Sequence, residues 1–199
     1  MSQLIDAWLV ADEWVGLVLG LLVVLLLIRQ NLWAWPLGVA YVLVSITPLW
    51  EARLYANLLL HVVGFLPLNL YGWYFWIAGK EEDDELPVTR ASPRTLAILA
   101  GMCLLATAAL GFYFDSATDA AWPYWDNAVF AASLAAMWLT ARKKLDNWAV
   151  WFGVNIVSVA LYYTQGVLPY ALLYLIYLGM AVTGFLAWRR TMHGTQATS

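Results

Sequence analysis

The sequence predicts an all-α integral membrane protein of seven transmembrane helices, in which two groups of three helices flank one connector helix. The first observation is composition. The 199 residues are 63% hydrophobic and only 12% charged, whereas soluble domains are about 45–50% apolar and about 25% charged. The second is that apolar stretches long enough to cross a bilayer recur along the whole chain. The third is that the first three of these stretches are similar in sequence to the last three.

The predicted membrane helices cover residues 9–28, 33–50, 54–78, 95–114, 127–141, 148–164 and 168–188. A helix satisfies its own backbone hydrogen bonds, as the hydrocarbon requires, and needs about 20 residues to cross it. We expect one membrane domain over residues 1–199. Residues 9–78 would form a first three-helix repeat and residues 127–190 a second one. Residues 79–126 between them would comprise a cytoplasmic loop, the connector helix (95–114) and an external loop, and residues 191–199 would form a cytoplasmic tail.

The basic residues predict the orientation of these helices. All lysines and arginines except Arg53 fall on one predicted side of the membrane, and Arg142, Lys143 and Lys144 form their densest group. Cytoplasmic loops are enriched in Lys and Arg. We therefore expect the N-terminus outside and the C-terminus in the cytoplasm. The first residues lack a basic region and a small-residue cleavage site, so no removable signal peptide is expected.

The composition also argues against several other classes of protein. A net charge of −3 gives no basic excess for binding nucleic acid. Cys103 is the only cysteine and the two histidines lie in unlike surroundings, so we expect no disulfide and no metal site. The chain has no glycine-rich phosphate loop and no cluster of polar catalytic groups at one membrane face. We expect neither an enzyme nor a bound cofactor.

An offset of 115 residues aligns the two groups of three helices. At this offset several residues coincide: Trp33 with Trp148, Gly38 with Gly153, Val42 with Val157, Tyr55 with Tyr170, Gly64 with Gly179 and Trp73 with Trp188. Three helices and a connector return the chain to its starting side, so the two groups would run parallel. This 3+1+3 plan is that of SWEET-type transporters, whose substrate site lies between the halves near the membrane midplane.

One helical face of the sixth predicted helix carries the most specific group of residues. Trp148, Trp151 and Asn155 share this face, and Ser158 and Tyr162 continue it. Two indoles beside an amide suit a flat heteroaromatic ligand, and a cationic ring would gain about 0.5–2 kcal/mol from cation–π attraction. Trp148 alternatively belongs to an interfacial aromatic belt, and Asn155 alternatively makes a helix–helix hydrogen bond.

Three further candidates lie on the second and third predicted helices. These are Tyr41, His61 and Tyr71. His61 is either a neutral hydrogen-bonding group or a proton relay. The interior of the predicted helices holds no Asp, Glu, Lys or Arg, and ion-coupled carriers usually keep such a residue. This pattern favours facilitated diffusion.

Several motifs resemble the Pnu-type vitamin transporters, the nicotinamide riboside transporter family. They are LYANLLL (54–60), NLYGWYFW (69–76), PYWD (123–126), ARKKLDNW (141–148) and the W-x-x-W-x-x-x-N pattern of Trp148, Trp151 and Asn155. The resemblance spans all seven predicted helices. It implies a SWEET-like fold in the bacterial inner (plasma) membrane and uptake of a vitamin precursor by facilitated diffusion. It also implies trapping by a cytoplasmic kinase, a substrate site lined by those three residues, and a homotrimer.

The resemblance leaves the choice of substrate open. Nicotinamide riboside is the first expectation, yet Tyr41 and His61 stand where nicotinamide riboside members of the family carry an Asn and a Gln. Thiamine is the alternative, because thiamine-carrying relatives share the fold and the aromatic motif, and thiamine is also a flat cation. A sugar-transporting SWEET relative is a third reading, since aromatic stacking and an amide also suit sugars.

Overall fold

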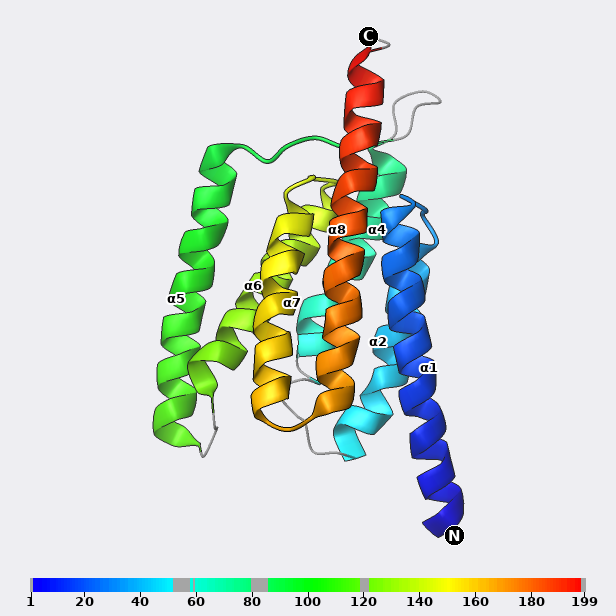
Figure 1. Ribbon diagram of the computed structural model, residues 1–199, viewed down its shortest axis with the longest axis vertical. Coiled ribbons are helices and arrows are strands. Elements are labelled where there is room, and N and C mark those ends of the chain that lie inside the picture. The colour runs from blue at the N-terminus through cyan, green and yellow to red at the C-terminus, as the bar shows by residue number, and fades with distance from the viewer. Residues whose placement is uncertain (1, 52–57, 59, 80–85, 119–121, 198–199) are drawn as a thin grey trace. The chain divides into compact units, whose positions relative to one another are not determined.

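A computed structural model describes residues 2–51, 58, 60–79, 86–118 and 122–197, with side chains within 15–47, 50, 58, 60–79, 86–118 and 122–194 (Figure 1). The elements are α1 (Ser2–Ile28), α2 (Ala34–Glu51), a π-helical turn η1 (Leu60–Phe65), α4 (Leu66–Ala78), α5 (Pro93–Ala117), α6 (Pro123–Ala141), α7 (Asn147–Thr164) and α8 (Leu168–Ala197). Every predicted membrane helix therefore has a helical counterpart. The described ranges contain no strand, only an isolated bridge between Thr89 and Lys144.

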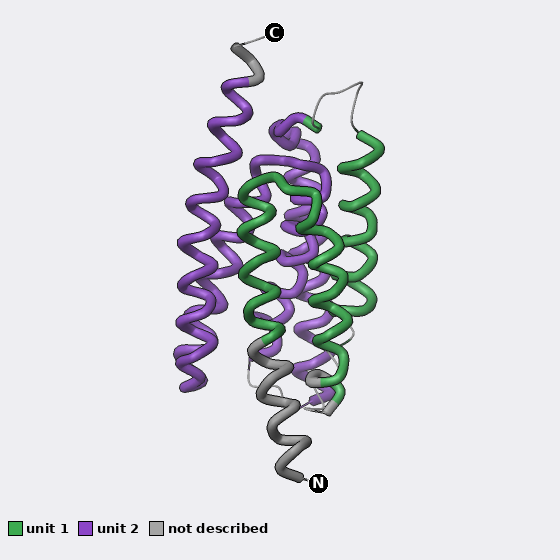
Figure 2. The backbone as a smooth tube through the Cα atoms, turned by 90° about the vertical axis from the view of Figure 1, so that its right-hand side faces the viewer, with its two compact units in different colours: residues 1–86 green, residues 87–199 purple. Residues whose placement is uncertain are grey.

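The chain divides into two compact units, residues 1–86 and 87–199 (Figure 2). In unit 1, α1 packs on α2, and α2 packs on η1 and α4. In unit 2, α5 packs on α6, α6 on α7 and α7 on α8. Short turns join the last three helices, so consecutive helices run in opposite directions. The predicted connector helix is α5, and it packs within unit 2.

Helices α1 and α6 end in the same way. After α1, the backbone N–H groups of Gln30 and Asn31 donate to the carbonyls of Leu27 (3.0 Å) and Leu26 (2.9 Å). After α6, the N–H groups of Lys143 and Lys144 donate in the same pattern to Thr140 and Leu139. Gln30 and Lys143 hold φ angles of 55° and 51°, the left-handed conformation that such a helix end needs.

These matched helix ends, and the buried tryptophans that follow them, align the two units at a spacing of 113 positions in place of the predicted 115. Gln30 corresponds to Lys143, and the buried Trp35 corresponds to the buried Trp148, each pair being 113 positions apart rather than 115. Trp33, which the offset of 115 pairs with Trp148, is 68% exposed. In the third helix of each unit, Trp76 is the buried counterpart of Trp188 in place of Trp73. The sequence comparison erred because both units carry clustered tryptophans that only burial distinguishes. The predicted match at Tyr55 lies outside the described residues.

The third predicted helix is also not one continuous α-helix. The π turn η1 precedes α4, and Pro67 is at the first turn of α4. Proline has no N–H to donate and its ring crowds the carbonyl four residues earlier. A wider π turn relieves this crowding at the junction. Residues 52–57 and 59 of the predicted segment lie outside the described chain.

Two described helices, Pro93–Ala117 and Leu168–Gly194, are long and apolar enough to cross a membrane by length and composition. Val15–Ile28 and Ala34–Thr47 are shorter apolar helices. Helix α5 buries only Gly111, beside Tyr124 of α6. Many of its apolar side chains are exposed, Leu104 by 73%, and the others are partly exposed. An apolar surface of this kind is typical of contact with lipid or another chain rather than water.

Candidate substrate-binding site

The inward face of α7 carries the predicted site. Asn155 and Ser158 are buried there, at 5% and 1% exposure, whereas Phe152 and Ile156 on the other side of the helix are open. This alternation follows from 3.6 residues per turn, because α7 packs on α6 and α8 with one face only. The structure therefore places Trp148, Trp151 and Asn155 along one side of α7, as their spacing predicts.

Asn155 is a polar residue of this face without a hydrogen-bond partner among the described residues, and the indole N–H of Trp148 is another. The Asn155 amide makes no hydrogen bond with any residue that the structure describes, although the residue is buried. A buried amide normally has partners, since an unmade hydrogen bond costs about 1–3 kcal/mol. The two donors and the acceptor of Asn155 are therefore available to a ligand.

Trp151 is oriented by a partner that the sequence does not indicate. Its Nε1–H donates to Oγ1 of Thr140 on α6 at 3.3 Å. Thr140 is fully buried, and its hydroxyl donates in turn to the carbonyl of Ala136 at 2.8 Å. This two-step chain fixes the plane of the indole beside Asn155. No residue spacing in the sequence points to Thr140, because the contact joins two different helices.

Trp148 lies in a different environment from Trp151. Its ring covers Gly184 of α8, where a Cβ atom would fall against the indole, and it meets the Trp188 ring edge-on at 5.5 Å and 90°. Its Nε1 is buried without a hydrogen-bond partner. The ring is only 3% exposed and its faces are occupied by α8. Trp148 therefore ties α7 to α8.

Unit 1 contains the same arrangement of tryptophan, glycine and tryptophan. Trp35 of α2 covers Gly72 of α4 and meets Trp76 edge-on at 5.3 Å and 79°. The Nε1 of Trp35 is also buried without a partner. We call these two arrangements the tryptophan clasps: Trp35–Gly72–Trp76 in unit 1 and Trp148–Gly184–Trp188 in unit 2.

Unit 1 also brings together two of its predicted site residues. The rings of Tyr41 and His61 lie 5.7 Å apart, and His61 meets Phe65 edge-on at 5.4 Å. Tyr71 lies apart from this pair and contacts Phe75 at 5.9 Å. The buried Asn69, whose Oδ1 packs against Gly38 without a hydrogen-bond partner, is a polar group that the sequence-based list omits.

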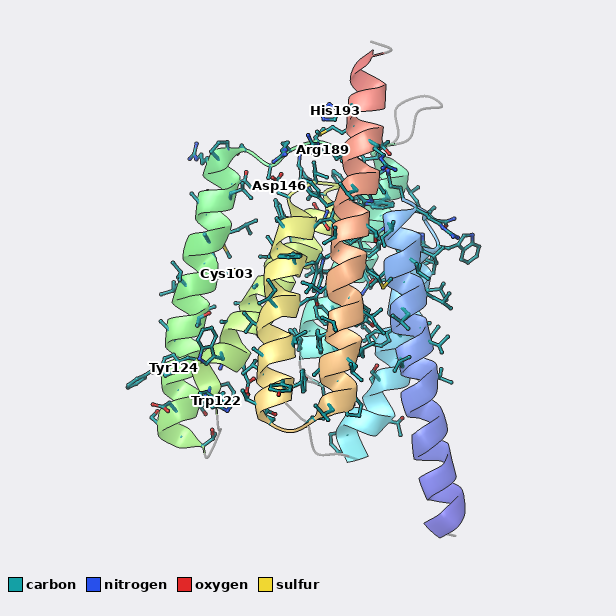
Figure 3. The ribbon with its side chains drawn as sticks, viewed as in Figure 1. Cys103, Trp122, Tyr124, Asp146, Arg189 and His193 are labelled. Atoms are coloured by element: carbon teal, nitrogen blue, oxygen red, sulfur yellow. The ribbon has the colours of Figure 1, made fainter. Side chains whose placement is uncertain are left out.

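The end of unit 2 that holds Asp146 is closed by polar contacts (Figure 3). Asp146 accepts from the Ala91 backbone at 2.7 Å and from Arg90 at 3.2 Å, while Lys144 donates to Thr89 at 2.8 Å. Burial, with a further contribution from Arg142, lowers the pKa of Lys144, and Asp146 partly opposes this effect. The segment before α5 is thereby fastened to the basic turn between α6 and α7.

The opposite end of unit 2 holds a group of tyrosines that the sequence-based list also omits. Tyr162 of α7 stacks on Tyr170 and Tyr174 of α8, each at a centroid distance of 5.3 Å. Tyr177 meets Tyr174 edge-on at 6.0 Å. The spacing of Tyr170, Tyr174 and Tyr177 places them on one face of a helix, and this pattern could have identified the group from sequence.

Comparison with known proteins gives one family. The family model described as "Nicotinamide mononucleotide transporter" matches residues 11–190. The nicotinamide riboside transporter PnuC of Escherichia coli strain K12 is 28% identical over 202 residues, covering 88% of this chain and 84% of that protein. The riboflavin/roseoflavin transporter RibM of Streptomyces davaonensis is 27% identical over 195 residues, covering 93% and 87%. The crystal structure of the vitamin B3 transporter PnuC has the same fold, with a TM-score of 0.73 and 21% identity over 94% of this chain and 83% of that one.

Proposed function

The chain belongs to the nicotinamide mononucleotide transporter family, and we propose on this basis that it takes up a flat vitamin precursor, nicotinamide riboside first, by facilitated diffusion. The relatives described above are transporters of nicotinamide riboside or riboflavin. Transport rather than catalysis is therefore the activity to test.

The unpartnered amide of Asn155 is the single observation that carries this proposal. It lies on the same face of α7 as Trp151, whose indole is held by Thr140. An amide and an oriented indole together offer hydrogen bonds to the polar edge of a heteroaromatic ring and a surface for its plane. A pyridinium ring would gain additional cation–π attraction from the indole.

The positions equivalent to this site in unit 1 have no such groups. At the spacing of 113, Gly38 corresponds to Trp151, the buried Val42 to Asn155, and Leu27 to Thr140. The two units are thus alike in their helix ends and tryptophan clasps, but they differ at the residues proposed to contact the ligand. We assign recognition of the ring to α7, and we keep Tyr41, His61 and Tyr71 of unit 1 as proposed substrate-binding residues. Trp148, enclosed by α8, would support the site from behind.

The matched clasps and helix ends of the two units support a SWEET-like 3+1+3 repeat. Each unit would be one half of an alternating-access transporter. The basic turn at Arg142–Lys144 would face the cytoplasm of a bacterium, where phosphorylation by a kinase would trap the product. Because the interior of the predicted spans holds no charged residue, transport would not be coupled to an ion. Assembly as a homotrimer in the inner membrane remains a prediction.

Riboflavin is the second candidate substrate. RibM is 27% identical to this chain, almost the same as the 28% of PnuC from Escherichia coli, and the match to RibM covers more of the chain. Tyr41 and His61 stand where an Asn and a Gln are expected for nicotinamide riboside. This difference also favours a substrate whose ring is not nicotinamide. Thiamine, the alternative suggested by the sequence, belongs in the same comparison.

Binding to the purified protein by isothermal titration would test the proposal. We expect nicotinamide riboside to bind more tightly than riboflavin or thiamine, and Asn155→Leu to lower its affinity about 10-fold or more, since one lost buried hydrogen bond costs about 1–3 kcal/mol. Phe152→Leu on the open side of α7 is the matched control. An unchanged affinity in Asn155→Leu would remove this residue from the site.

Uptake into proteoliposomes tests the mechanism separately. With ionophores present to dissipate proton and sodium gradients, we expect the wild-type protein to equilibrate nicotinamide riboside down its own gradient. Uptake that requires either ion gradient would contradict facilitated diffusion.

A further inference from the structure

The stacked tyrosines of unit 2 have the properties of a ring-binding surface. The Tyr162 ring is inclined by only 22° to Tyr170 and 14° to Tyr174, so the three aromatic planes are nearly parallel. Tyr170 is 48% exposed. Tyr170 is therefore the member of the stack at which a flat ring from outside the protein could add to it.

A carboxylate accompanies the stack. Asp126 is in the first turn of α6, and Tyr162 is in the last full turn of α7. Because α6 and α7 are antiparallel, these turns lie at the same end of unit 2. Asp126 therefore lies at the end of unit 2 that holds the tyrosine stack. Aromatic faces with a nearby negative charge suit a flat cation better than a neutral ring.

The stack is distinct from the Asn155 site. Seven residues of α7 separate Asn155 from Tyr162, which is about 10 Å at 1.5 Å per residue. One ring cannot occupy both places at once. Both residues nevertheless lie on the inward face of α7, so a ligand leaving one place could follow the same helix to the other.

Two backbone hydrogen bonds close the turn beside the stack. Gly166, at φ +75°, donates to the carbonyl of Tyr163 at 3.1 Å, and Val167 donates to Tyr162 at 2.9 Å. These two bonds form a complete helix-end motif between α7 and α8. The tyrosines therefore lie on two helix ends that a short hydrogen-bonded turn joins. This connection favours a binding surface that is already formed before a ligand arrives.

We propose that Tyr162, Tyr170, Tyr174 and Asp126 form an outer capture subsite for planar cationic rings such as a pyridinium. This proposal rests on the proposed function, which places this end of unit 2 outside the membrane. The stack holds the cation first, and the ring then passes along α7 to Asn155. A neutral flavin ring stacks on the same tyrosines but gains nothing from Asp126.

Two variants with matched controls test the subsite through binding of 1-methylnicotinamide, a cation, and nicotinamide, its neutral counterpart, to the purified protein. Tyr170→Leu should weaken binding of the cation about threefold to tenfold, whereas Tyr170→Phe, which keeps the aromatic face, should not. Asp126→Asn should weaken binding of the cation and leave binding of nicotinamide unchanged. Equal loss in Tyr170→Leu and Tyr170→Phe, equal loss of both ligands in Asp126→Asn, or no loss at all would overturn the proposal.

Uptake kinetics separate this inference from the proposed function. In proteoliposomes, Tyr170→Leu should raise the KM for nicotinamide riboside with little change in maximal rate, because the Asn155 site is intact. If the wild-type protein transports no vitamin but the pattern with 1-methylnicotinamide holds, the proposed function fails and the subsite stands. If transport is normal and Tyr170→Leu leaves both KM and ligand binding unchanged, the subsite fails alone.

Discussion

At the scale of single residues, the two neighbouring tryptophans of α7 have different tasks. Trp148 covers Gly184 and has its faces occupied, while Trp151 points its Nε1–H to Thr140 on α6. The sequence shows two indoles three positions apart, but their partners lie on different helices. A hydroxyl group on α6 thus holds the indole of Trp151, whereas α8 holds that of Trp148.

Thr140→Val tests whether this orientation matters for the ligand. Valine keeps the branched shape of threonine but leaves the Trp151 Nε1–H without an acceptor, which costs about 1–3 kcal/mol. We expect the affinity for the transported vitamin to fall about threefold to tenfold in Thr140→Val and to be kept in Thr140→Ser. Titration of the purified variants measures this difference. Identical affinities in the two variants would show that the hydroxyl has no positioning role.

At the scale of elements, close helix packing depends on a glycine beneath each clasp. The Trp148 ring lies over Gly184, and the Trp35 ring lies over Gly72. Any side chain at these glycines would push the rigid indole away and separate the paired helices. The Nε1 atoms of both tryptophans are buried without a hydrogen-bond partner.

Gly184→Ala should therefore destabilise unit 2 although alanine is the better helix former. Overpacking a tight contact costs about 1–3 kcal/mol, more than the gain of about 1 kcal/mol in helix propensity. Gly179→Ala on the same helix is the control, since nothing lies within 4 Å of a Cβ there. Thermal unfolding in detergent should give a lower midpoint for Gly184→Ala and an equal or higher one for Gly179→Ala. A reversed order would mean that the clasp does not hold α7 to α8.

At the scale of the whole molecule, the two units share their helix ends and tryptophan clasps and differ at the positions of the proposed site. The helix ends at Gln30 and Lys143 and the two clasps repeat at spacings of 112–113. The residues of the proposed site do not repeat, because Gly38 and Val42 stand where unit 2 has Trp151 and Asn155. A shared framework with one specialised half is consistent with a substrate that has one aromatic ring to recognise.

The repeat register makes a prediction about tryptophans in unit 1. Trp35→Leu should lower the unfolding midpoint strongly, since truncating a buried tryptophan costs about 3–5 kcal/mol when taken to alanine and less to leucine. Trp33→Leu should have little effect, because that side chain is 68% exposed. Unfolding midpoints of the two variants measured side by side test the register. A larger loss in Trp33→Leu would restore the spacing of 115.

The sequence by itself determined the seven helical segments, the family resemblance and the inward face of α7. Each depends on neighbours along the chain, because a helix makes its own backbone hydrogen bonds and buries a face set by its period. Only the tertiary structure decided the clasps, the register of the repeat, the partner of Trp151 and the tyrosine stack. These features depend on which of several similar aromatic residues meet across two helices. Sequence composition and spacing do not distinguish an aromatic residue that becomes buried from a neighbouring one that stays exposed.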